Sequence, residues 1–142
     1  MRVASKAVTL LTKSDLISYW LDSAERDHKT MEHLYSTRDY HWSLFMGHLV
    51  IEKLLKALIV ARQPEGSNVP LSHDLLLLAC LAGLEPDRRQ QDLLDLFTAF
   101  NISARYPDYK ESFYRKCTPE YTAQRLREIG EVRAWLLSIL RK

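Results

Sequence analysis

Three long segments of this chain carry apolar side chains at steps of three and four residues. They are residues 15–35, 40–61 and 119–140. Such spacing puts the apolar side chains on one face of an α-helix, and about 20 residues of helix span roughly 30 Å. Only residues 36–38 connect the first two segments, so these two helices must be antiparallel neighbours. The pattern predicts a bundle of long amphipathic helices.

The remaining sequence predicts two shorter helices and two irregular stretches. Ser72 is a suitable N-cap for a helix over residues 73–82, and Pro86 suits the opening of a helix over residues 86–100. The irregular stretches are residues 63–70 (QPEGSNVP) and 101–116. Only 4 Gly and 5 Pro occur, too few for the tight turns of an all-β fold. The predicted fold class is therefore all-α, an antiparallel up-and-down bundle of about five helices, similar to a four-helix bundle.

Two residues of the second long segment make local predictions. Asp39 precedes it and is a candidate N-cap, because its short carboxylate can accept a bond from an orphan N–H group. Gly47 lies within the apolar face, where it costs about 1 kcal/mol relative to Ala. A glycine there predicts the close approach of a neighbouring helix.

Length and cysteine content limit which class of protein this chain can belong to. The 142 residues fit one domain, with residues 1–13 expected to form a loosely ordered N-terminal extension. The longest apolar run, residues 75–84, is about half the roughly 20 residues that a bilayer requires. Cys80 and Cys117 belong to no CxxC motif and form no disulfide framework. The expected location is the cytoplasm, away from membranes.

The overall charge of +2 excludes a strongly basic nucleic-acid-binding protein by composition. The charge is unevenly distributed, however. From residue 101 onward, nine basic and five acidic residues give +4, which leaves −2 for the rest. A mildly positive third of the chain suits a nucleotide, RNA or an acidic partner, although solvated helix faces explain it about as well.

The histidines are candidate metal ligands. A di-metal site in a helical bundle uses a Glu-x-x-His motif on each of two helices. Glu25 and His28 have this spacing, but no second copy occurs, and His48 and Glu52 are in reverse order. Core or surface histidines with local partners are the favoured interpretation, and neither a metal nor another cofactor is predicted.

Glu52 and Lys56 stand one helical turn apart within the apolar sequence HLVIEKLLKAL. His48 is one turn before Glu52 and can pair with it. One interpretation is a solvated edge of salt bridges. The other is a polar pair that faces a cleft or a dimer interface, which makes Glu52 and Lys56 candidate binding residues.

The segment SARYPDY, residues 103–109, gathers unusual chemistry in a short loop. Arg105 can bind a phosphate or a carboxylate with two hydrogen bonds, and Tyr106 and Tyr109 can stack on a base. Asp108 can orient Arg105 or a ribose hydroxyl. The alternative is an ordered loop that closes the end of the bundle, with Arg105 bound to carbonyls or to Asp108.

Three segments resemble the HEPN domain family (higher eukaryotes and prokaryotes nucleotide-binding). They are YWLDSAERD (19–27), FMGHLVIEKLLKAL (45–58) and ARYPD (104–108), and HDL (73–75) also fits the family's pattern. The resemblance covers about residues 15–140. It implies a small all-α bundle that commonly dimerises and is often encoded beside a minimal nucleotidyltransferase, in toxin–antitoxin or related two-component systems.

Other members of the family are ribonucleases with an Arg-x(4–6)-His motif late in the bundle. The last histidine here is His73, so no histidine follows Arg105. Arg26 and His33 have the spacing but lie in the first helix, where the family does not place the motif. The leading hypothesis is a non-catalytic HEPN protein, a homodimer that binds a nucleotide-type ligand or a nucleotidyltransferase. A diverged ribonuclease toxin and a purely structural interaction module are the alternatives.

Overall fold

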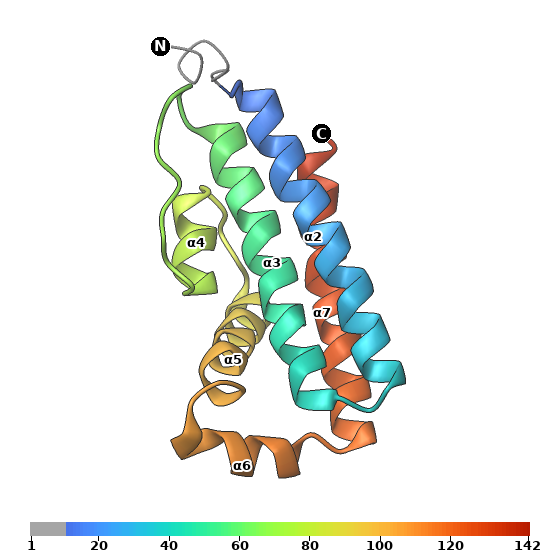
Figure 1. The fold of residues 1–142 in the computed structure, drawn as a ribbon. Coiled ribbons are helices and arrows are strands. Elements are labelled where there is room, and N and C mark those ends of the chain that lie inside the picture. Colours follow the sequence, from blue (N-terminus) through green and yellow to red (C-terminus); the bar gives the residue numbers. More distant parts are fainter. Residues whose placement is uncertain (1–10) are drawn as a thin grey trace, which may run out of the picture.

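The computed structural model describes residues 11–142, and all regular structure in this range is helical. Three long helices lie side by side along the molecule: α2 (Lys13–Ser36), α3 (Tyr40–Arg62) and α7 (Pro119–Leu140) (Figure 1). The short α4 (Leu75–Leu81) and α5 (Arg88–Ser103) pack on α3, and α6 (Pro107–Lys116) crosses the end of the bundle (Figure 1). The predicted all-α helical bundle is confirmed.

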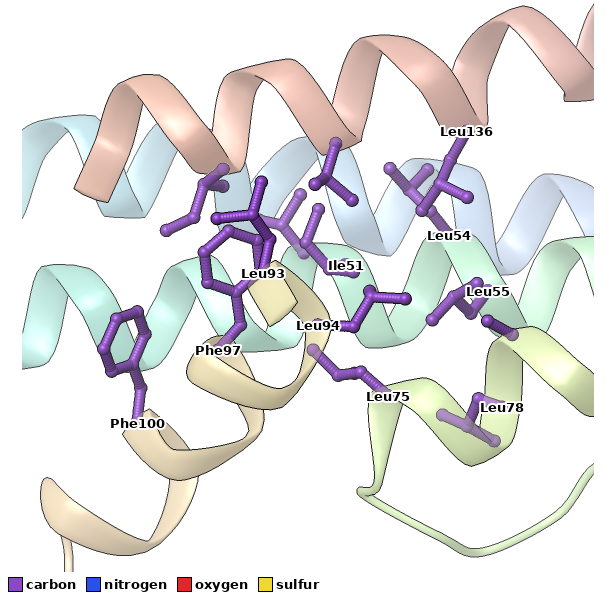
Figure 2. Close-up of a cluster of buried hydrophobic side chains, with 14 of the residues drawn as sticks. Ile51, Leu54, Leu55, Leu75, Leu78, Leu93, Leu94, Phe97, Phe100 and Leu136 are labelled. Carbon is purple, nitrogen blue, oxygen red and sulfur yellow. The ribbon is translucent and has the colours of Figure 1, made fainter. Parts of the chain in front are cut away.

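The centre of this arrangement is α3, whose residues from Val50 to Val60 are all buried except Lys53. Figure 2 shows side chains from α4, α5 and α7 meeting those of α3 in one hydrophobic core. Leu75 and Leu78 come from α4, Phe97 and Phe100 from α5, and Leu136 from α7. The amphipathic helices therefore share one hydrophobic core, which positions α3 and its polar residues in the interior.

The boundaries of the long helices agree with the apolar spacing that predicted them. Helix α7 begins at Pro119, where its apolar segment begins, and Thr118 caps it by accepting a hydrogen bond from the Tyr121 amide. The prediction of five helices was one short for the described residues. Residues 101–116, expected to be irregular, contain the end of α5 and the whole of α6.

Helix α6 was not predicted because only one of its residues, Phe113, is buried. Phe113 packs on Phe100 of α5, with 5.6 Å between ring centroids. In a segment this short and polar, one buried anchor is too little apolar pattern to indicate a helix. The signals that were present are local ones, with Pro107 in the first turn and basic residues in the last.

The starts of three helices differ in detail from the predictions. Asp74 rather than Ser72 caps α4, and its Oδ1 accepts from the Leu77 amide at 3.2 Å. Asp87 caps α5 in a capping box with Gln90, so this helix begins after Pro86. Asp39 precedes α3 but makes no cap bond with its side chain, because its Oδ2 accepts from the Thr37 hydroxyl at 2.7 Å.

The expected N-terminal extension, residues 1–13, lies mainly outside the described residues. Thr12 and Lys13 are described, and they form the capped start of α2. No helix within residues 11–142 is long and apolar enough to cross a membrane.

Gly47 confirms the predicted close approach of neighbouring helices. A Cβ atom at this position would overlap Ile129 Cδ1 of α7 and would lie 3.4 Å from Met31 Sδ of α2. Ile129 is fully buried and has little room to move. Gly130 on α7 is the opposite case, with no atom within 4 Å of an added Cβ.

We predict opposite effects for the same substitution at these two helical glycines. Gly130→Ala should raise the free energy of unfolding by up to about 1 kcal/mol, because Ala is the better helix former. Gly47→Ala should lower it by about 1 kcal/mol, because crowding against Ile129 outweighs that gain. Urea denaturation measures both, and equal stabilisation by the two variants would contradict the close approach at Gly47.

Candidate functional site

A row of three polar residues is buried on one face of α3. His48, Glu52 and Lys56 follow one another at single-turn spacing and are exposed by 0%, 4% and 6%. Lys56 Nζ donates to Glu52 Oε2 at 2.9 Å and lies 5.4 Å from the centroid of the Trp20 ring. Both members of the pair are buried, so the interpretation as a solvated edge is wrong.

The second oxygen of Glu52 binds a residue from the linker between α3 and α4. His73 Nδ1 lies 2.7 Å from Glu52 Oε1, and the His73 carbonyl accepts from His48 Nε2 at 3.0 Å. His48 Nε2 is 3.7 Å from Glu52 Oε1. The His73 side chain stays 56% exposed. The buried row thus fixes both the backbone and the ring of His73 at the surface.

These contacts set the charge states of the row. Burial by itself would raise the pKa of the Glu52 carboxyl, but the hydrogen bonds from His73 and Lys56 and the Lys56 charge hold this pKa below its usual value. Burial lowers the pKa of His48 and outweighs the opposing effects of the His73 carbonyl and the Glu52 charge. A negative Glu52 beside a neutral His48 is the arrangement that follows near neutral pH.

Arg105 lies where α5 ends and before α6 begins. Its Nε donates to the Asn101 carbonyl at 2.9 Å. The guanidinium carbon is 5.7 Å from the centroid of Phe45 on α3 and 5.4 Å from that of Tyr106. Within residues 11–142 no carboxylate forms an ion pair with it. The hydrogen bond and the two rings orient the guanidinium while its terminal amino groups remain available.

The other predicted loop residues lie at the start of α6. Tyr106 and Tyr109 are about half exposed, and Asp108 occupies the first turn. Asp108 forms no ion pair with Arg105 in the described part of the chain, although that pairing was one expectation. The structure therefore groups Arg105 with Tyr106, and leaves Asp108 and Tyr109 on the solvent side of the helix start.

The predicted site residues lie at two depths. Glu52 and Lys56 are buried, and the exposed ones are Arg105, Tyr106, Asp108 and Tyr109. Glu52 contacts the exposed His73 ring. The missed members of the site are His48 and His73. His48 had a signal in its one-turn spacing from Glu52. No sequence signal indicated the contact of His73 with Glu52, because it joins residues 21 positions apart through a loop.

The two residues of the Glu-x-x-His spacing in α2 contact different partners. Glu25 pairs with Arg133 of α7 at 2.9 Å, and His28 lies 3.9 Å from Glu32. Across residues 11–142 there is no group of three or more His, Cys, Asp or Glu side chains suited to a metal ion.

Comparison with known families identifies the class of protein. The family model described as HEPN domain matches residues 17–140, which include every helix from α2 to α7 apart from the first residues of α2. This chain belongs to the HEPN domain family. Neither the curated proteins nor the solved structures contain a significant match to it.

We predict that Glu52→Gln lowers the free energy of unfolding by about 3 kcal/mol, because it leaves the buried ammonium of Lys56 without a counter-charge. Glu131→Gln is the matched control, since Glu131 pairs with Arg89 on the surface. It should leave the urea midpoint nearly unchanged. Similar shifts for both variants would contradict a special role of the buried pair.

Proposed function

We propose that this HEPN domain protein binds a nucleotide-type ligand at the surface that carries Arg105 and His73. The observation that carries the proposal is the way in which the Arg105 guanidinium is held. Its guanidinium is oriented by the Asn101 carbonyl and by two aromatic rings, yet it has no carboxylate partner among residues 11–142. A guanidinium held in this way suits the bidentate binding of a phosphate.

The surroundings of Arg105 complement such a ligand. Tyr106 is half exposed beside the guanidinium and offers a ring on which a base can stack. His73 presents its Nε2 edge to solvent while Nδ1 is bound to Glu52, so it can serve as a second hydrogen-bonding group. Glu52 and Lys56 act through His73 in this proposal rather than by touching the ligand.

We also propose that the protein acts as a homodimer with a minimal nucleotidyltransferase partner, in a two-component system of the toxin–antitoxin kind. Membership of the HEPN family supports this. The exposed leucines Leu71, Leu77 and Leu81 on and before α4 offer an apolar surface for either contact. A small nucleotidyltransferase encoded beside this gene, and its co-purification with the chain, would support the partner.

The proposal predicts that Arg105→Ala reduces the affinity for ATP or GTP at least about tenfold, a loss of roughly 1.4 kcal/mol. Isothermal titration calorimetry measures the affinity, and circular dichroism should show unchanged helical content. Arg115→Ala is the matched control, because Arg115 is exposed and pairs only with Glu111 within the described residues. Unchanged binding by the Arg105 variant would contradict the proposal, and a lowered melting temperature in its place would favour the structural module.

One observation favours the ribonuclease as a second candidate function. A carboxylate hydrogen-bonded to one ring nitrogen of a histidine orients the other nitrogen as a general base, and Glu52 and His73 have this relation. His73 precedes Arg105 in the sequence, so the motif spacing of the family ribonucleases did not indicate it. RNA degraded by the wild type and left intact by His73→Ala would establish this candidate, and undegraded RNA would remove it.

A further inference from the structure

A second concave surface lies beside the Arg105 region and is unused by the proposed function. It is a pocket of about 490 Å³ between the start of α3 and α6. We call it the ring pocket. Its lining consists of His41, Trp42, Pro107, Lys110, Glu111 and Tyr114.

The walls of the ring pocket are aromatic and cationic. The His41 ring lies 5.0 Å from Trp42 and 5.2 Å from Tyr114 between centroids, with Tyr114 nearly perpendicular to it. Lys110 Nζ is 5.6 Å from the centroid of Trp42. Tyr114 is 59% exposed. Rings and a cation around one small cavity are what a planar, electron-rich ligand requires.

His41 adds a polar group without a partner. Its Nδ1 is buried and has no hydrogen bond, which is uncommon for a buried polar atom. Burial lowers the pKa of His41, and the charge of Lys110 lowers it further against the opposing effect of Asp39. A neutral imidazole carries one donor and one acceptor, which is the pattern found along the edges of nucleobases.

The ring pocket connects to Arg105 through a continuous series of contacts. Trp42 meets Phe45 edge to face at 5.7 Å, and Phe45 lies 5.7 Å from the guanidinium carbon of Arg105. The pocket and the guanidinium therefore flank the same aromatic side chain. Glu111 is the acidic group in the lining, and its carboxylate is 3.2 Å from Arg115 Nε, which offsets its charge.

We propose that the ring pocket is a base-binding subsite, which holds an unpaired nucleobase of an oligonucleotide whose phosphate lies at Arg105. The proposal rests on the proposed function, because it takes Arg105 as the phosphate-binding group. It goes further in naming a single-stranded oligonucleotide as the ligand and in placing a neighbouring base against the aromatic lining of the ring pocket. Stacking of this kind tolerates different bases, since every base has a π-face.

The test compares two fluorescein-labelled RNA hexamers by fluorescence anisotropy: hexaadenylate, and a hexamer with the same backbone but no bases. The wild type should bind hexaadenylate at least about fivefold more tightly than the abasic hexamer. Tyr114→Ala and Lys110→Ala should each remove most of that preference. Tyr19→Ala and Lys29→Ala, at exposed positions on α2, are the matched controls and should retain it.

The outcomes separate this inference from the proposed function. Equal binding of the two hexamers by the wild type, or an equal effect of Tyr114→Ala and Tyr19→Ala, would overturn the base-binding subsite alone. Arg105→Ala should weaken the binding of both hexamers to a similar extent. If Arg105→Ala weakens the binding of neither hexamer, the phosphate site is overturned. The base-binding subsite, which depends on that site, is then overturned too. Trp42 contributes to the packing of α3, so no conclusion depends on its removal.

Discussion

The carboxylate of Glu52 is the buried charge around which the polar part of this molecule is organised. A carboxylate that is 4% exposed is stable only with partners, and it has two, Lys56 from its own helix and His73 from the linker. The hydrogen bond to His73 holds the linker on α3 and places an imidazole at the surface. The backbone of His73 is bound a second time by His48.

The location of this carboxylate follows from the role of α3 in the bundle. Because α2, α4, α5 and α7 all pack on α3, this helix has little surface left for solvent. The polar residues on its buried faces must therefore form hydrogen bonds with one another or with residues of neighbouring segments. The row on α3 does so through His73, and Arg105 meets the same helix one turn earlier through Phe45. Through these two contacts α3 is linked to side chains, His73 and Arg105, that are exposed at the surface.

Sequence patterns predicted those features that depend on neighbouring residues. Apolar periodicity predicted α2, α3 and α7, Gly47 predicted the close approach of helices, and one-turn spacing predicted the pairing of Glu52 with Lys56. The patterns did not predict α6, which has one buried anchor, or the contact between His73 and Glu52, which depends on how a linker folds back. The burial of Glu52 was likewise undetermined, because i, i+4 pairs occur on exposed and buried faces alike.

The most direct test of the central role of Glu52 is the tautomeric state of the histidines, measured by long-range ¹H–¹⁵N correlation NMR at a pH where both are neutral. His73 should carry its proton on Nδ1, because that nitrogen donates to Glu52. His48 should carry its proton on Nε2, which donates to the His73 carbonyl. Protonation of His73 on Nε2 would contradict the account, because no hydrogen bond from the ring to Glu52 would then exist.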